Sequence, residues 1–229
     1  RRLQSDAKGL VKLVTVAPEQ PGAMEFIRTA TAEGIHVSVG HTIADYDTAS
    51  AAFAAGADHA THLYNGMPPL HHREPGVIGA ARDDGKVMPE IICDGIHVHG
   101  SVIRATFAMF GAERMILISD SLRATGMPDG EYPFGGQMIE VHGNRATLLG
   151  HPETLAGSVT SLMGCMRQAV KFGIPLADAV RAASYNPAKS IGMENRFGSL
   201  EKGKDATCVL LDKETLAIQK IIFRGNVVK

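Results

Sequence analysis

Two histidines each close a short apolar run of the kind that forms a β-strand. His41 ends "IHVSVGH" (35–41), and His62 lies near the end of "ADHATHL" (57–63). Asp120 ends a third such run, "RMILISD" (114–120). Imidazole is the commonest metal-binding side chain, and a carboxylate beside a bound metal can take a proton from water. Two strand-end histidines with a strand-end aspartate therefore suggest metal-assisted hydrolysis.

Each of these residues also has a simpler interpretation. A single histidine at a strand end is more often a hydrogen-bonded structural residue, so the argument rests on the three residues occurring together. His59 lies three residues before His62, and side chains alternate along a strand, so we expect His59 to face away and to be structural. The other histidines outside this pattern lie in loops or lack a surrounding constellation: His36, His71, His72, His99, His142 and His151.

Strand-like and helix-like segments alternate over the first 120 residues. Strand patterns occur at 13–19, 35–41, 57–63, 89–98 and 114–120, and helical patterns at 21–34, 44–56 and 101–111. Apolar strands separated by helices indicate a parallel sheet covered by helices. Because chemistry in such folds gathers at the carboxyl ends of the strands, this arrangement would bring His41, His62, His97 and Asp120 together.

The alternation stops after Asp120. Residues 135–150 resemble a hairpin that turns at 142–144, helices are expected at 158–173 and 175–192, and short strands return at the end. We therefore expect an α/β part over 1–200 and strands of a small β-domain over 201–229.

The composition agrees with a globular enzyme. The 229 residues are 45% hydrophobic, their net charge is −1, and no basic block is present, so nucleic-acid or membrane-surface binding gets no support. Three widely spaced cysteines without a CxxC pair argue against a disulfide framework and fit a reducing cytoplasm. No apolar run approaches the ~20 residues of a membrane-spanning helix.

Several segments together carry a family resemblance: "VTVAPE", "VSVGHTIADYD", "GADHATHLYNGMPPLHHREPG", "ICDGIHV", "ISDSLRATGMPDGEYPFGG", "LAGS" and "GSLEKGKDA". In these the sequence resembles the N-acetylglucosamine-6-phosphate deacetylases of the amidohydrolase superfamily. The resemblance implies a TIM-type (β/α)8 barrel with a small β-sandwich domain. The chain opens "RRLQSDAKGL" without methionine and lacks the family's "EGP" segment, whose glutamate is the third metal ligand, so we expect an N-terminally incomplete barrel.

The resemblance also implies a role for each matching residue. His41 and His62 match the metal ligands, and Asp120 matches the catalytic aspartate. The substrate-binding positions are Asn65, Gly66, Arg73, Asp94, Gly95, Ile96, His97, Leu155, Ala156 and Gly157. Asn65 and Gly66 would contact the substrate phosphate, and His97 would help to stabilise the oxyanion. Arg73 would reach the phosphate in a neighbouring subunit, which implies a homodimer.

The implied activity is hydrolysis of the acetamido group of N-acetyl-D-glucosamine 6-phosphate to D-glucosamine 6-phosphate and acetate, in amino-sugar catabolism. It requires one divalent metal ion, expected to be Zn²⁺, although Fe²⁺ also accepts imidazole and carboxylate ligands. A second ion stays open. Two alternatives remain: another amidohydrolase acting on a different N-acyl sugar or cyclic amide, and a non-catalytic sugar-phosphate-binding protein.

Overall fold

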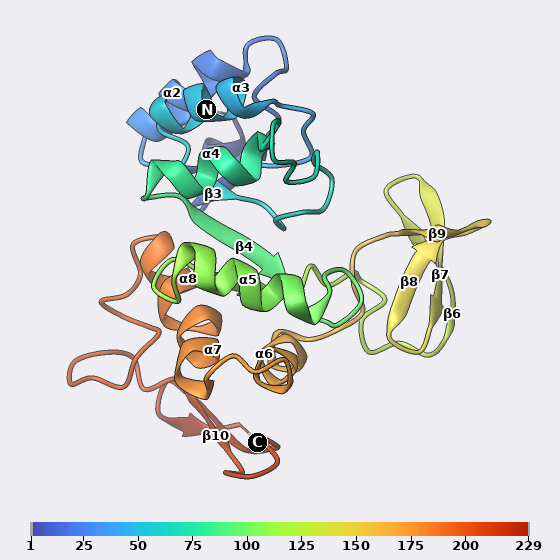
Figure 1. Ribbon diagram of the computed structural model, residues 1–229. Helices are drawn as coiled ribbons and strands as arrows, with labels where there is room; N and C mark the ends of the chain where they lie inside the picture. Colours follow the sequence, from blue (N-terminus) through green and yellow to red (C-terminus); the bar gives the residue numbers. More distant parts are fainter. Residues whose placement is uncertain (1, 229) are drawn as a thin grey trace.

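A parallel sheet forms the centre of the molecule in the computed structural model, which describes residues 2–228 (Figure 1). Its five strands lie in sequence order: β1 (Leu13–Val16), β2 (His36–Val39), β3 (His59–Ala60), β4 (Met88–Ile92) and β5 (Ile116–Ile118). Each pairs in parallel with the next. The alternation predicted from the sequence is therefore confirmed, although β3 is much shorter than the predicted 57–63. The strand predicted over 89–98 ends at Ile92, so His97 lies in the following turn and not at a strand end.

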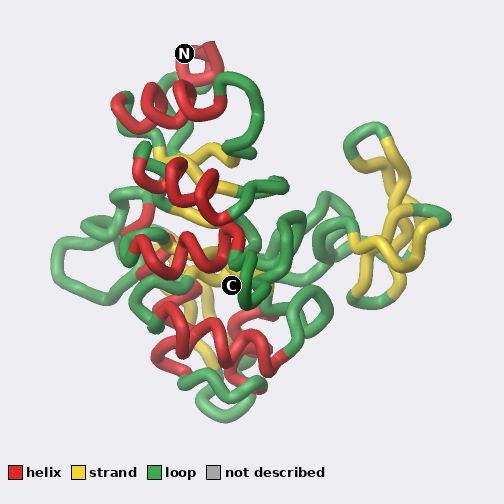
Figure 2. Tube along the Cα trace, turned by 45° about the horizontal axis from the view of Figure 1, so that its top comes forward, coloured by secondary structure: helices red, strands yellow, loops and turns green. Residues whose placement is uncertain are grey.

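Helices connect the strands and lie over one face of the sheet (Figure 2). After a short α1 (Arg2–Asp6) come α2 (Ala23–Ala32), α3 (Tyr46–Ala54), α4 (Gly76–Asp84) and α5 (Gly100–Phe110). The sequence did not predict α4, because it begins at Pro75 and Gly76 in a stretch with the composition of a loop. Burial of Val77 and Ile78 against the sheet stabilises it.

The two faces of the sheet differ in character. Val37 and Val39 on β2 are fully buried in the main core, on the helix-covered face. On the other face, the hydroxyl of Thr61 lies 2.6 Å from that of Ser38 and 3.1 Å from that of Thr15. Because residues paired across parallel strands point to the same side, this polar face continues from one strand to the next.

A separate antiparallel sheet follows β5 and stands to one side of the molecule in Figure 1. It contains β6 (Gly130–Phe134), β7 (Gln137–His142), β8 (Arg145–Leu148) and β9 (His151–Leu155). The predicted hairpin is present, since His142 pairs with Arg145 and Gly143 turns the chain with a φ of 59°. The prediction missed β6 and β9, whose largely exposed residues do not alternate in polarity.

Three further helices complete this part of the chain: α6 (Leu162–Lys171), α7 (Leu176–Ala183) and α8 (Tyr185–Ser190). The single helix predicted over 175–192 is wrong, because it breaks at Ser184, where φ is −137° and ψ is −65°. Pro187 has no N–H to donate to Ala183, so a new helix beginning at Tyr185 places the proline in a first turn.

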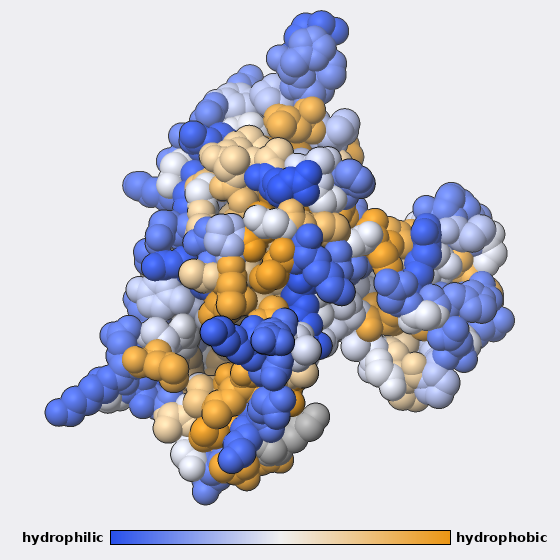
Figure 3. Space-filling model, turned by 60° about the horizontal axis from the view of Figure 1, so that its bottom comes forward, coloured by the Kyte–Doolittle hydropathy of each residue, from blue (hydrophilic) through white to orange (hydrophobic). Residues whose placement is uncertain are grey.

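The chain ends in a small antiparallel sheet of β10 (Cys208–Leu211), β11 (Ile218–Phe223) and β12 (Asn226–Val227). It lies within the predicted second part, 201–229, whose boundary stays a prediction. Val209, Phe223 and Val227 on it are exposed, and Figure 3 shows apolar side chains gathered on this side of the molecule. Among residues 2–228 no helix has the length and apolar content needed to cross a membrane.

Candidate active site

Three predicted site residues share a backbone conformation that the sequence does not reveal. His41, His62 and Asp120 each lie two residues beyond the end of a strand, after β2, β3 and β5 respectively. Their φ angles are 48°, 31° and 49°. Non-glycine residues in this left-handed region cost about 1–3 kcal/mol each and cluster at active sites. The same left-handed turn is thus repeated at the carboxyl edge of the sheet.

The two histidines meet through their Nε2 atoms. These nitrogens are 2.8 Å apart, and the ring centroids are 4.5 Å apart with planes inclined at 78°. Nitrogen ligands of one tetrahedral zinc ion lie about 3.4 Å from each other, because each Zn–N bond is about 2.1 Å, so the two Nε2 atoms need to move apart by only about 0.6 Å. His41 and His62 therefore fit two positions in the coordination shell of a divalent transition-metal ion.

Electrostatics place Asp120 close to this pair. Burial and the neighbouring His41 lower the pKa of His62, while the charge of Asp120 raises it; the net direction is downward. A lowered pKa keeps His62 neutral, which is the form that binds a metal ion. Asp120 thus lies within electrostatic reach of His62, one of the two candidate ligands.

A glycine and a glutamate hold the turn that carries His41. A Cβ on Gly40 would lie 2.5 Å from the Thr61 Cβ, so only glycine allows β2 and β3 to approach so closely here. Glu19, which follows β1, accepts hydrogen bonds from the Thr42 hydroxyl and from the Ile43 N–H, the latter at 2.9 Å. Sequence reasoning missed Glu19, although its place after a strand pattern resembles that of His41.

The loop after β3 forms a backbone hollow beside the histidines. Positive φ angles recur at His62, Tyr64 and Gly66, and such alternation makes concave arrays of N–H groups that bind anions. The Gly66 N–H has no partner among the described residues, and a Cβ on Gly66 would lie 3.3 Å from His41 Nδ1. Asn65 donates its side-chain amide to the carbonyls of His62 and Leu63, which braces the loop.

After β4, the Asp94–His97 segment is a compact turn around one carboxylate. Asp94 Oδ1 accepts the N–H groups of Ile96 and His97, at 2.8 and 2.9 Å, and Oδ2 lies 2.7 Å from His97 Nδ1. Gly95 supplies the positive φ of 83° that the turn needs. The Asp94 side chain is 2% exposed, and these bonds outweigh its burial, so its pKa is lowered. Asp94 therefore positions the His97 ring and leaves Nε2 for a ligand.

The segment Leu155–Gly157 lies directly beside Asp120. The Ser158 N–H donates to the Asp120 carbonyl at 2.8 Å, and a Cβ on Gly157 would lie 3.1 Å from the same oxygen. The Leu122 N–H in turn donates to the Ser158 carbonyl. This pairing fixes the backbone on both sides of the candidate base.

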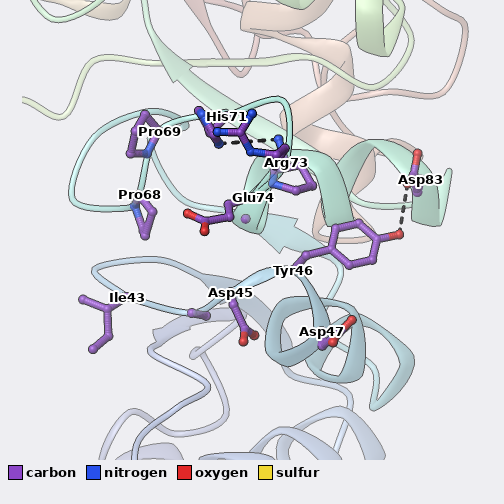
Figure 4. Close-up of a pocket in the computed structure, with 13 residues that line it drawn as sticks. Ile43, Asp45, Tyr46, Asp47, Pro68, Pro69, His71, Arg73, Glu74 and Asp83 are labelled. Atoms are coloured by element: carbon purple, nitrogen blue, oxygen red, sulfur yellow. Dashed lines mark hydrogen bonds between the residues drawn. The ribbon is translucent and has the colours of Figure 1, made fainter.

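Arg73 lies apart from these residues, on the long loop between β3 and α4. Its guanidinium is 2.7 Å from His72 Nε2. It lines a hollow of about 970 Å³ with Glu74, His71 and residues of the loop after β2 (Figure 4). A second hollow, which His41 and Gly66 line, shares Ile43 and Pro68 with the first.

Comparison with known proteins now identifies the family. A model described as "Amidohydrolase family" matches residues 2–229. The chain belongs to the amidohydrolase family. This family assignment agrees with the hydrolase chemistry that the strand-end residues suggested.

Amidohydrolase relatives with assigned activities cover nearly the whole chain. It is 43% identical over 228 residues to the N-acetylglucosamine-6-phosphate deacetylase of Bacillus subtilis (strain 168), covering 99% of this chain and 57% of that protein. It is 39% identical over 217 residues to the N-acetylgalactosamine-6-phosphate deacetylase of Escherichia coli O157:H7, covering 94% and 56%. The resemblance stated from the motifs is thus confirmed, and the chain spans little more than half the length of these relatives.

A solved structure supports the fold. A mutant N-acetyl-D-glucosamine-6-phosphate deacetylase from Mycobacterium smegmatis, in complex with N-acetyl-D-glucosamine-6-phosphate, superimposes with a TM-score of 0.94 and 39% identity. The match covers 99% of this chain and 60% of that one. The expected fold class, an amidohydrolase barrel with a small β-domain, is confirmed, and this chain corresponds to part of it.

Proposed function

We propose that this protein hydrolyses the acetamido group of N-acetyl-D-glucosamine 6-phosphate, releasing acetate and D-glucosamine 6-phosphate. The observation that carries the proposal is the convergence of His41 and His62, whose Nε2 atoms are 2.8 Å apart, with Asp120 within electrostatic reach of His62. Relatives of 36–43% identity bear the name of this deacetylase. The roles of the individual residues are part of this proposal.

His41 and His62 would hold one divalent ion, and zinc suits two imidazole ligands. Such an ion supplies Lewis acidity, which polarises a carbonyl group and acidifies water. The chain's part is to present two neutral imidazoles at a fixed separation. Glu19 and Gly40 contribute by fixing the turn on which His41 lies.

Asp120 acts as the base and then as the acid. Its carboxylate accepts a proton from the attacking water and returns it to the nitrogen of the departing sugar amine. The hydrogen bond from the Ser158 N–H to the Asp120 carbonyl holds the backbone while the proton moves. His97, oriented by Asp94, offers its Nε2 to a substrate polar group or to the developing oxyanion.

The phosphate end of the substrate needs a different set of groups. The open N–H of Gly66, in the backbone hollow braced by Asn65, suits an anion. A guanidinium can form two parallel hydrogen bonds with a phosphate, so we assign this role to Arg73 of a neighbouring subunit in a homodimer. A cytoplasmic location is part of the proposal, supported by three unpaired cysteines.

Acetate release by the purified, metal-loaded protein tests this function. The 6-phosphates of N-acetylglucosamine and N-acetylgalactosamine are compared with unphosphorylated N-acetylglucosamine and a cyclic amide. We expect hydrolysis of a 6-phosphorylated N-acetyl sugar and little of the others. Turnover of the cyclic amide alone would favour a different amidohydrolase, and sugar-phosphate binding without acetate release would favour a binding protein.

A further inference from the structure

A second group of metal-binding side chains lies at the opposite edge of the parallel sheet. His36 and His59 are the first residues of β2 and β3, and Asp58 directly precedes β3. The candidate catalytic histidines follow the other ends of the same strands. At about 3.3 Å per strand residue, roughly 15 Å separate His36 from His41 along β2. The His36–Asp58–His59 cluster is therefore distinct from the candidate active site.

The three side chains converge on one carboxylate. Asp58 Oδ2 lies 2.6 Å from His36 Nδ1, and Asp58 Oδ1 lies 2.7 Å from His59 Nδ1. One potential ligand atom from each residue lies within 4.8 Å of the other two. The His59 side chain is 1% exposed, whereas those of His36 and Asp58 are 31% and 39% exposed. The cluster thus has one buried member, His59, and is accessible to solvent at His36 and Asp58.

One buried polar atom beside the cluster lacks a partner, and a buried carboxyl group lies on the same side of the sheet. If Asp58 accepts an Nδ1–H from both rings, a neutral His59 keeps a bare Nε2, and this atom is buried without a hydrogen-bond partner among residues 2–228. Glu90 faces the same side of the sheet as His59, because Met88, two residues before Glu90, pairs with His59 across the strands. The Glu90 side chain is buried, and no described group donates a hydrogen bond to it. Its pKa is raised to about 7, mainly by burial, and His59 lowers it, so the two groups are within electrostatic reach.

We propose that His36, Asp58 and His59 bind a divalent transition-metal ion of the zinc and cobalt class. Two imidazole nitrogens with one carboxylate suit such an ion better than calcium or magnesium, which prefer oxygen ligands. The nitrogen–carboxylate distances of 2.6 and 2.7 Å would lengthen to about 3.3 Å around such an ion, and the three candidate ligand atoms already lie within 4.8 Å of one another. The solvent-open side leaves room for water as a further ligand.

Binding would also give these two buried groups a role. The ion replaces the two Nδ1 protons, and in each ring the proton moves to Nε2, so both rings stay neutral. His59 then has an Nε2–H to donate, and Glu90 is the neighbouring acceptor, an arrangement common for metal-bound histidines. The ion would join the starting ends of β2 and β3, and it would stabilise the fold in proportion to its concentration relative to its Kd.

The rival explanation is a hydrogen-bonded cluster without metal, in which a protonated Glu90 donates to the bare His59 Nε2. Cobalt titration separates the two. The double variant His41→Ala/His62→Ala removes the candidate catalytic ligands and is stripped with a chelator, dialysed and titrated with Co²⁺. The matched control adds Asp58→Asn, which keeps the shape of the side chain and removes its charge. We expect the double variant to bind one Co²⁺ more per chain than the control.

Equal binding by the two proteins overturns the proposal. A second measurement guards against local misfolding: nitrogen NMR of the double variant should show His59 changing from Nδ1–H to Nε2–H when Zn²⁺ is added, and retention of the Nδ1–H form would also overturn it. Zn²⁺ should raise the melting temperature of the double variant but not that of the control. Asp58→Asn alone should leave deacetylation unchanged, so failure of this site and failure of the proposed activity give different results.

Discussion

Backbone strain coincides with the candidate catalytic residues. His41, His62 and Asp120 all adopt positive φ, between 31° and 49°, immediately past the ends of their strands. None is a glycine, so each position carries a conformational cost that the surrounding contacts must offset. Glu19 holds the turn at His41, and Ser158 holds the backbone at Asp120. These contacts indicate that the strained backbone is kept because it places the three side chains, and not because the chain needs a turn there.

Asp120→Asn should abolish deacetylation and leave metal binding intact. Asparagine keeps the shape of aspartate but cannot accept the water proton, so we expect kcat to fall at least ~100-fold. The measurement is acetate release alongside metal content of the same preparation. An Asn variant with more than a tenth of wild-type kcat would contradict the role of Asp120 as base.

His62→Ala should inactivate the protein, whereas His59→Ala should not. The two residues are close in sequence, but His62 meets His41 while His59 meets Asp58. A metal site rarely tolerates the loss of one of its few protein ligands. Activity after saturation with Zn²⁺, compared between the two variants, checks the assignment. Loss of activity in His59→Ala alone would move the catalytic site to the other edge of the sheet.

At the level of strands and loops, the sequence predicted the positions of the strands better than the backbone conformation of the turns that follow them. Apolar runs at 13–19, 35–41 and 114–120 predicted strands, because a buried parallel strand needs apolar residues on both faces. The left-handed turns after them could not be predicted: histidine and aspartate adopt this conformation more often than most non-glycine residues, but still in a small minority of cases, so residue type does not mark the position. The prediction that the side chains of His59 and His62 point in different directions agrees with the structure, but side-chain alternation along a strand is not the reason. β3 ends at Ala60, so side-chain alternation does not extend to His62.

Sequence reasoning placed the site residues at one edge but left out their supports. The strand-end histidines and Asp120 were identified because few residue types bind metals or move protons. Glu19 was not, since its role depends on hydrogen bonds between segments that the sequence does not relate. Asp94 was named only as a substrate-binding position, and its hydrogen bonds to the His97 turn were not foreseen. The His36–Asp58–His59 cluster was missed because its members meet only across the β2–β3 pairing.

Glu19→Ala should weaken metal binding at the His41 turn. The change removes the acceptor of two hydrogen bonds, from Thr42 and Ile43, and bonds to charged groups contribute about 1.5–3 kcal/mol each. Glu19→Gln, which keeps one amide oxygen as an acceptor, is the matched control. We expect the metal Kd to rise about 10-fold or more in Glu19→Ala and less in Glu19→Gln, measured by chelator competition. Unchanged metal affinity in Glu19→Ala would show that the turn keeps its conformation without these two hydrogen bonds.

Glu90 should make stability depend on pH. Burial raises its pKa from 4.5 to about 7, so its protonated form stabilises the fold fully below about pH 4.5. That contribution is lost as the pH rises through 7 and amounts to at most about 3 kcal/mol. With chelator present, Glu90→Gln should be more stable than wild type at pH 8 and show a flatter profile from pH 4.5 to 7 in urea unfolding. The exposed Glu131→Gln is the control, and parallel profiles for all three proteins would refute the prediction.

On the scale of the whole molecule, this chain matches only part of its relatives. It covers 57% of the Bacillus subtilis protein, and several apolar residues of its C-terminal sheet are exposed. The hollow around Arg73 lies on the outside of the α/β part, between loops that extend past the strand ends (Figure 4). This position on a loop away from the sheet is what supports the proposal that Arg73 reaches the site of a second subunit.

Arg73→Ala should raise KM for the 6-phosphorylated substrate sharply. A charged hydrogen bond contributes about 1.5–3 kcal/mol, which corresponds to a 10- to 100-fold rise. Activity on unphosphorylated N-acetylglucosamine should barely change, because that substrate has no phosphate for the guanidinium to bind. An equal loss on both substrates would indicate that the substitution disturbs the loop instead.

Subunit mixing decides whether Arg73 acts across a dimer. Arg73→Ala and Asp120→Asn subunits are exchanged, and heterodimers are verified by mass. In each heterodimer, the subunit carrying Arg73→Ala keeps Asp120 and receives Arg73 from its partner, so one complete site forms. We therefore expect activity at low substrate concentration to return towards half that of the wild type, while the two unmixed homodimers stay impaired. If heterodimers form without recovery, Arg73 acts within its own chain or has no part in the site, and the shared phosphate contact is wrong.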